Sequence, residues 1–74
     1  MTDMQYAVFF EGDAATGYSA YAPDLPGCIA TGKTLDETRS RMRSAIEFHI
    51  RGLREDGDPV PEPSGLAEMV EVAA

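Results

Sequence analysis

Residues 23–37, Pro-Asp-Leu-Pro-Gly-Cys-Ile-Ala-Thr-Gly-Lys-Thr-Leu-Asp-Glu, encode a turn, a short strand, a second turn and the start of a helix. Pro26 and Gly27 suit the central positions of a type II turn, because proline presets φ and glycine accepts a positive φ. Thr34 and Glu37 match a capping box: the Thr34 hydroxyl accepts from the Glu37 N–H, and the Glu37 carboxylate accepts from the Thr34 N–H. The stretch therefore predicts a strand-to-helix junction.

Beyond this junction, residues 35–56 are predicted to form an amphipathic helix. Apolar side chains recur there at three- and four-residue steps, and the stripe comprises Leu35, Thr38, Met42, Ala45, Ile46, His49, Ile50 and Leu53. Gly57 can adopt the left-handed conformation that ends a helix. The following segment, residues 58–63, contains three prolines and is expected to be stiff and extended.

Strand patterns lie on both sides of the helix. Residues 4–11 alternate with a period of two, residues 12–17 form a polar hairpin loop, and residues 18–22 and 28–31 form two further strands. Gly32 bounds the third strand, and Val70 and Val72 favour a short strand over residues 68–73. The order is β-β-β-α-β, which predicts an α+β two-layer sandwich: an antiparallel sheet with one long helix on one face.

The sequence does not decide which face of the sheet packs against the helix. If Tyr6, Val8 and Phe10 face the helix, then Phe9, Ala7 and Tyr21 lie on the uncovered side. The alternation alone does not decide between the two faces. In either case an apolar sheet face or edge strand remains for a partner to cover.

A chain of 74 residues is expected to form a single domain, residues 1–74, with a thin core. Cys28 is the only cysteine and His49 the only histidine, so neither an internal disulfide nor a metal cluster would support that core. We therefore expect a homo-oligomer, dimer or larger. The free cysteine, and a start without a signal sequence, favour the cytoplasm.

Charge is unevenly distributed in this acidic chain, whose net charge is −7. All six basic residues lie between residues 33 and 54 beside three acids, which leaves that segment at about +3. The rest of the chain is acidic, which favours a basic protein partner over general nucleic-acid binding. Contact of the helix arginines with RNA stays an open alternative.

Candidate catalytic chemistry is sparse. Cys28 and His49 could form a nucleophile–base pair, but a small strand residue and a histidine on an apolar stripe more often serve packing. Glu11, Asp13 and Asp24 could bind a cation only if they converge. We predict no catalytic, cofactor-binding or metal-binding residue. A degenerate RNase H-like enzyme that binds metal through these acids is kept as an alternative.

With these residues in view, the chain resembles the HicB-like antitoxin family. The matching features run nearly end to end: Tyr6, Phe9 and Phe10 in the first strand, Gly17-Tyr18, the Pro-Asp-Leu-Pro-Gly-Cys run of residues 23–28, Gly32, residues 34–37, Ala45-Ile46, His49, Gly57 and residues 61–64. The resemblance implies a partial RNase H-like fold without nuclease activity. It also implies that the chain neutralises a small basic HicA-type mRNA interferase by masking it.

The resemblance and the charge together suggest partner-binding acids at Asp24, Glu62, Glu68 and Glu71. Relatives commonly carry a C-terminal DNA-binding domain, whereas this sequence ends at Ala74, so no DNA binding is expected. A solitary module with another role, binding RNA or a different protein, is the second alternative. Pro26, Gly27, Gly32, Thr34, Glu37 and Gly57 are assigned structural roles in turns and caps.

Overall fold

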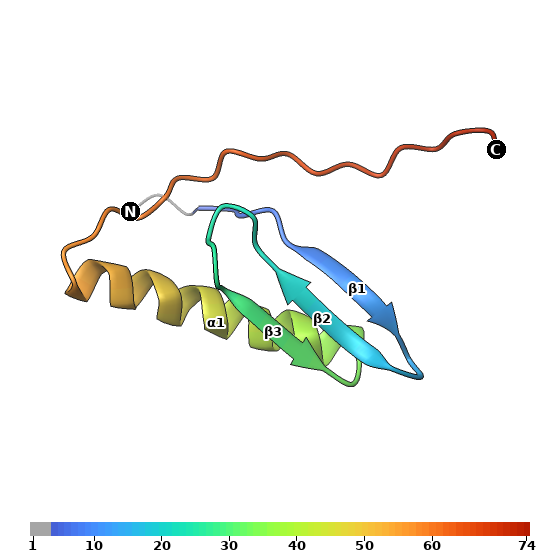
Figure 1. The fold of residues 1–74 in the computed structure, drawn as a ribbon, viewed down its shortest axis with the longest axis horizontal. Helices are drawn as coiled ribbons and strands as arrows, with labels where there is room; N and C mark the ends of the chain where they lie inside the picture. Colours follow the sequence, from blue (N-terminus) through green and yellow to red (C-terminus); the bar gives the residue numbers. More distant parts are fainter. Residues whose placement is uncertain (1–3) are drawn as a thin grey trace.

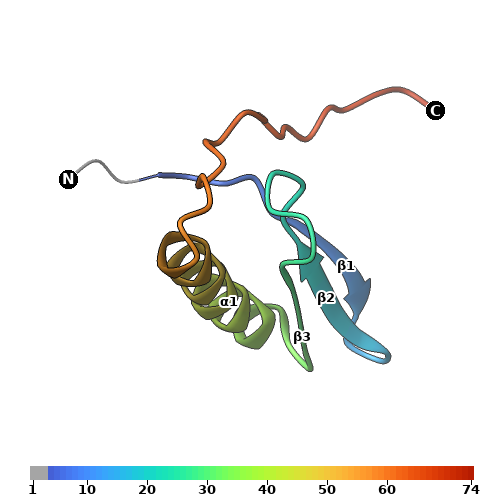
Figure 2. The same cartoon turned by 60° about the vertical axis from the view of Figure 1, so that its left-hand side comes forward.

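Three antiparallel strands and a long helix make up the computed structural model, which describes residues 4–74 (Figure 1). The strands are β1 (Phe9–Asp13), β2 (Gly17–Tyr21) and β3 (Ile29–Gly32), and the sheet order is β1-β2-β3. Helix α1 (Leu35–Glu55) covers one face of this sheet (Figure 2). The predicted α+β class is confirmed, with the antiparallel sheet and the single covered face.

The first strand is shorter and lies later in the chain than residues 4–11. Phe9 is its first paired residue and lies opposite Tyr21, the last residue of β2. Residues before Phe9 would need partners after Tyr21, but the chain turns there: the Leu25 N–H donates to the Ala22 carbonyl over 3.0 Å. Pro23, without an N–H, lies inside this turn. The hairpin turn is also tighter than predicted, because β1 continues to Asp13 and β2 begins at Gly17.

The Pro26-Gly27 turn is confirmed. The Cys28 N–H donates to the Leu25 carbonyl over 3.0 Å, and Gly27 has a φ of 85°. These are the hydrogen bond and the positive φ that a type II turn requires. Two consecutive turns thus bring Leu25 and Cys28 into the core, where both are buried.

The helix start agrees with the capping box in one half only. The Glu37 N–H donates to the Thr34 hydroxyl over 3.0 Å, as predicted. The Glu37 carboxylate, however, accepts from the Lys33 N–H over 2.9 Å, and not from Thr34. The chain bends at residues 33–34, which presents the Lys33 N–H to the first helical turn. A Cβ on Gly32 would approach the Thr38 hydroxyl oxygen to 2.6 Å, so glycine allows β3 to lie against this turn.

The helix ends at Glu55, one residue before the predicted end, and Gly57 closes it as expected. Gly57 has a φ of 73°. Its N–H donates to the Arg54 carbonyl over 3.2 Å, and the Asp58 N–H donates to the Leu53 carbonyl over 2.8 Å. This pair of bonds is a Schellman motif, which satisfies the last carbonyls of the helix.

The core lies between α1 and one face of the sheet, which decides the question that alternation left open. Its buried apolar residues are Ala20, Ala22, Leu25, Cys28 and Met42, and Thr38 is buried beside them. Tyr6, Val8 and Phe10 pack against this core, while Phe9 and Tyr21 are exposed on the other face. Leu35, predicted on the buried stripe, is more exposed than the rest because it begins the helix.

The predicted strand over residues 68–73 is wrong for this structure. The chain after the helix is extended, but none of it joins the sheet within the described residues. Figure 1 shows the segment running past β1 to the C-terminus as an isolated extended chain. Valine-rich alternation favours a strand only where a neighbouring strand supplies hydrogen bonds, and this tail has no such neighbour.

Candidate functional site

The sheet face opposite α1 is exposed, and we call it the open sheet face. Its outward side chains are Phe9, Glu11, Ser19, Tyr21, Ile29 and Thr31, all of them exposed. The strand register sorts these side chains into two rows across the three strands. One row is polar, with Ser19 opposite both Glu11 and Thr31.

The other row is apolar. Tyr21 lies opposite both Phe9 and Ile29, and the rings of Phe9 and Tyr21 are 5.5 Å apart between centroids at an angle of 37°. This spacing lies within the favourable range for aromatic pairs. Ile29 is 67% exposed. An apolar row with polar neighbours has the arrangement of a protein-binding surface, in which an apolar centre is surrounded by a polar rim.

Acids lie around the open sheet face. Glu11 lies within it, and Asp13 follows on the same side of β1. The Asp13 carboxylate accepts from the Ala15 N–H, the Thr16 N–H and the Thr16 hydroxyl over 2.8–3.0 Å. The bonds from Thr16 hold the pKa of Asp13 below its ordinary value, so this carboxylate is charged at neutral pH.

Asp24, one of the predicted partner-binding acids, has a structural contact. Its carboxylate accepts from the Ser64 hydroxyl over 2.6 Å and from the Ser64 N–H over 2.9 Å. These bonds hold the pKa of Asp24 below its ordinary value. They join the loop after β2 to the chain after α1, forty residues further on. We call this contact the Asp24–Ser64 anchor.

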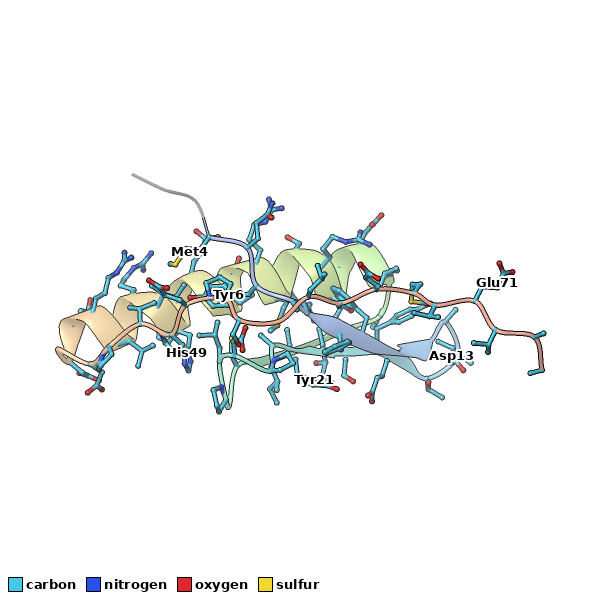
Figure 3. All side chains as sticks on the ribbon, turned by 90° about the horizontal axis from the view of Figure 1, so that it is seen from above. Met4, Tyr6, Asp13, Tyr21, His49 and Glu71 are labelled. Atoms are coloured by element: carbon cyan, nitrogen blue, oxygen red, sulfur yellow. The ribbon has the colours of Figure 1, made fainter. Side chains whose placement is uncertain are left out.

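The other three predicted acids divide into two places. Glu62 lies near Tyr6, whose hydroxyl donates to the Pro61 carbonyl. Burial raises the pKa of Tyr6, and the negative charges of Asp24 and Glu62 add to that rise. Glu68 and Glu71 lie on the exposed tail, residues 65–74, as Figure 3 shows for Glu71. The structure therefore brings Asp24 and Glu62 together and leaves Glu68 and Glu71 apart from them.

The acids considered for metal binding do not converge. Asp13 lies at the hairpin end of the sheet, and Asp24 follows the opposite end of β2. Figure 3 shows the wide separation of Asp13 from Tyr6, the residue beside Asp24. Within residues 4–74 no group of three histidine, cysteine or acidic side chains could hold a metal ion. Glu11, Asp13 and Asp24 therefore do not form the site that a metal-dependent RNase H-like enzyme needs.

Cys28 and His49 have packing roles. Cys28 is buried beside Leu25 and Met42, and burial raises the pKa of its thiol. A raised pKa disfavours the thiolate, which is the nucleophilic form. His49 is half-buried on the stripe of α1 predicted from the sequence.

A second surface lies between α1 and the segment that leads into β1, and we call it the arginine groove. Its apolar floor includes Tyr6, Val8, Phe10, Ile46 and Ile50, and four arginines line it, namely Arg39, Arg43, Arg51 and Arg54. The Arg39 guanidinium lies 5.9 Å from the centre of the Phe10 ring and 2.6 Å from the Asp36 carboxylate. Arg41 lies elsewhere, where it donates to the Thr31 carbonyl over 3.0 Å.

The sequence alone indicated Phe9 and Tyr21 as possible outward residues, but it missed Ile29 and the Asp24–Ser64 anchor. Ile29 became part of the row only through its register opposite Tyr21, which no local pattern specifies. Ser64 belongs to the family motif at residues 61–64, yet no local sequence pattern connects it to Asp24. No helix within residues 4–74 has the length and apolar character needed to cross a membrane.

Comparison with known proteins places this arrangement in a family. Residues 6–73 match the family model described as HicB-like antitoxin of bacterial toxin-antitoxin system. A UPF0150 protein of Synechocystis is 37% identical over 67 residues, which cover 90% of this chain and 85% of the relative. A UPF0150 protein of Thermoplasma acidophilum is 32% identical over 71 residues, which cover 96% of this chain and all of the relative.

Two longer proteins also match. Antitoxin HicB 2 of Photorhabdus laumondii is 34% identical over 73 residues, and the match spans 97% of this chain but 52% of the antitoxin. An uncharacterised protein of Haemophilus phage HP1 is 37% identical over 54 residues, and the match spans 41% of its length. The chain thus corresponds to about half of these longer relatives and to most of the UPF0150 proteins. The family match over residues 6–73 shows that this chain belongs to the HicB-like antitoxin family.

Proposed function

We propose that this chain is a non-enzymatic antitoxin module that neutralises a small basic HicA-type mRNA interferase by covering it. Membership of the antitoxin family supports the general role. The observation that carries the proposal is the apolar row of Phe9, Tyr21 and Ile29, whose outward neighbours on the three strands include the acids Glu11 and Asp13. We further propose that the protein acts in the cytoplasm as a homo-oligomer.

In this proposal the open sheet face is the centre of the toxin contact. Tyrosine and phenylalanine are enriched at the centres of protein interfaces, whereas acids at the rim act chiefly on the association rate and on partner choice. Glu11 and Asp13 supply negative charge on this face, and Asp24 follows Tyr21 by three residues. Asp24 and Glu62 lie near Tyr6, and in this proposal they add a second acidic contact to the toxin. Glu68 and Glu71 stay predictions of a further toxin contact.

Co-expression with a HicA-like toxin, sought as a small basic reading frame beside this gene, tests the proposal. Growth should be restored, and the purified complex should survive gel filtration. Ile29→Asp places a charge in the apolar row and should weaken capture about tenfold or more. Phe48→Asp is the matched control, because Phe48 is 73% exposed but lies on α1. This control should capture the toxin as the wild type does.

Salt dependence gives a second readout. Association should slow markedly between low and physiological ionic strength, because screening weakens the attraction between an acidic antitoxin and a basic toxin. RNA cleavage by the purified chain with added divalent metal would contradict the proposal. Tight RNA binding without capture of the neighbouring protein would instead favour a solitary module that uses its helix arginines.

A further inference from the structure

The arginine groove has an apolar floor that nothing in the structure covers. Val8, Phe10 and Ile46 form part of this floor, and all three are only half-buried. The groove runs beside β1, which pairs with β2 on one side only. The free side of β1 therefore presents unpaired backbone N–H and carbonyl groups next to an apolar surface. Such an edge can accept an additional strand.

The exposed tail, residues 65–74, has the complementary pattern. It is extended, and all of its residues are exposed. In an extended chain alternate side chains share a face, so Leu66, Glu68, Val70 and Val72 lie on one face, and Met69 and Glu71 on the other. A strand added beside β1 would place the face with Leu66, Val70 and Val72 on the groove floor.

The charges of the arginine groove and of the tail are also complementary. The groove carries Arg39, Arg43, Arg51 and Arg54 against Glu47 and Glu55. The tail carries Glu68 and Glu71 and no basic residue. Glu68 shares the face of Val70, so it would lie among the groove arginines when that face is buried, and it would then not be available for the toxin contact. Opposite charges at the edge of an apolar contact favour one register and one partner.

The tail does not occupy the groove of its own chain. The Asp24–Ser64 anchor and the contact of Tyr6 with Pro61 hold its first residues, and three prolines stiffen the approach. Beyond the anchor the tail passes β1 without joining the sheet (Figure 1). Met69 is 100% exposed and Leu66 is 86% exposed. Apolar side chains at this exposure favour burial in a partner.

We infer that two copies of this chain exchange their tails, so that residues 66–72 of each copy lie along β1 in the arginine groove of the other. A two-fold axis makes the exchange reciprocal, so both grooves are filled and both tails are paired at once. The inference describes the homo-oligomer proposed above and rests on that part of the proposed function. Its test needs no toxin, so its failure would leave toxin capture unaffected.

Sedimentation of the full-length chain at micromolar concentration is the first test. The wild type should sediment as a dimer. Val70→Asp should raise the dissociation constant about tenfold or more, because it places a charge on the apolar floor. Met69→Asp is the matched control on the opposite face and should remain dimeric. A wild-type monomer, or equal effects of the two variants, would overturn the inference.

A charge exchange between chains is the second test. One variant carries Arg43→Glu with Arg51→Glu, and the other carries Glu68→Arg; each alone should be mainly monomeric. Mixing them should give a heterodimer, because every groove then meets a tail of opposite charge. Glu71→Arg, on the other face, should stay dimeric alone. If mixing restores no dimer, the tail does not bind the groove of a second copy.

Discussion

The loop of residues 22–28 and the tail of residues 65–74 both lack regular secondary structure, yet they differ completely in how they are held. The loop closes two turns with backbone hydrogen bonds of 3.0 Å and buries Leu25 fully. Beyond the anchor, the tail makes no backbone hydrogen bond like those of the loop, and its apolar side chains are exposed to solvent. Irregular chain is therefore fixed here by turn geometry and burial, and where both are missing the chain lies exposed.

The largest expected effect is a difference in stability between alanine substitutions at two leucines, one in the loop and one in the tail. Leu25→Ala should lower the free energy of unfolding by about 2–5 kcal/mol, because it leaves a cavity among Ala22, Cys28 and Met42. Leu66→Ala should leave the stability of the monomer unchanged, since Leu66 is exposed. Chemical denaturation of dilute protein measures both. Similar losses in the two variants would mean that the tail packs on the domain in solution.

A smaller difference in stability is expected between alanine substitutions at two glycines, one in the loop and one in the tail. Gly27→Ala should cost about 1 kcal/mol or more, because a side chain at its φ of 85° brings Cβ close to the next carbonyl. Gly65→Ala should cost nothing measurable, since the added Cβ would meet no atom within 4 Å. Thermal unfolding compares the two. An unchanged melting temperature for Gly27→Ala would show that the loop does not need its turn.

The smallest expected effect concerns the anchor that joins loop and tail. The folded pKa of Asp24 lies below its ordinary value of 3.8, so the anchor contributes at neutral pH and is lost as the pH falls through that lowered pKa. NMR of the Ser64 and Gly65 amides should show a transition below pH 3.8. Ser64→Ala should move the Asp24 transition upward to its ordinary range. An Asp24 transition that is the same in both proteins would show that Ser64 does not hold this carboxylate.

The sequence predicted what is decided locally. The Pro26-Gly27 turn, the Thr34 hydroxyl cap and the helix end at Gly57 each depend on residues within one turn of chain, and each is confirmed. The Glu37 carboxylate bonds Lys33 instead of Thr34 because the bend before the helix, not the capping pattern, decides which N–H lies within reach.

What depends on distant partners was not predicted. The start of β1 at Phe9 is set by the end of β2, and the face that meets α1 is set by packing across the core. The alternating sequence of residues 68–73 is typical of a strand, but it does not specify whether an adjacent strand is available to pair with it. The residues of the candidate site also fall into those that the sequence indicated and those that only the tertiary structure reveals. Phe9 and Tyr21 were recognised as possible outward residues, whereas Ile29 and the anchor required the tertiary structure.

The Asp24–Ser64 anchor marks the boundary between the residues that stabilise the fold and the exposed tail that follows them. It fixes where the tail leaves the domain and makes no contact with any side chain after Ser64. Substitutions in residues 65–74 should therefore cost the folded domain little stability, because these residues are exposed. If two copies exchange their tails as inferred above, changes in this segment alone would decide which related chains assemble with one another. The segment that contributes least to folding would then be the one that keeps related systems apart.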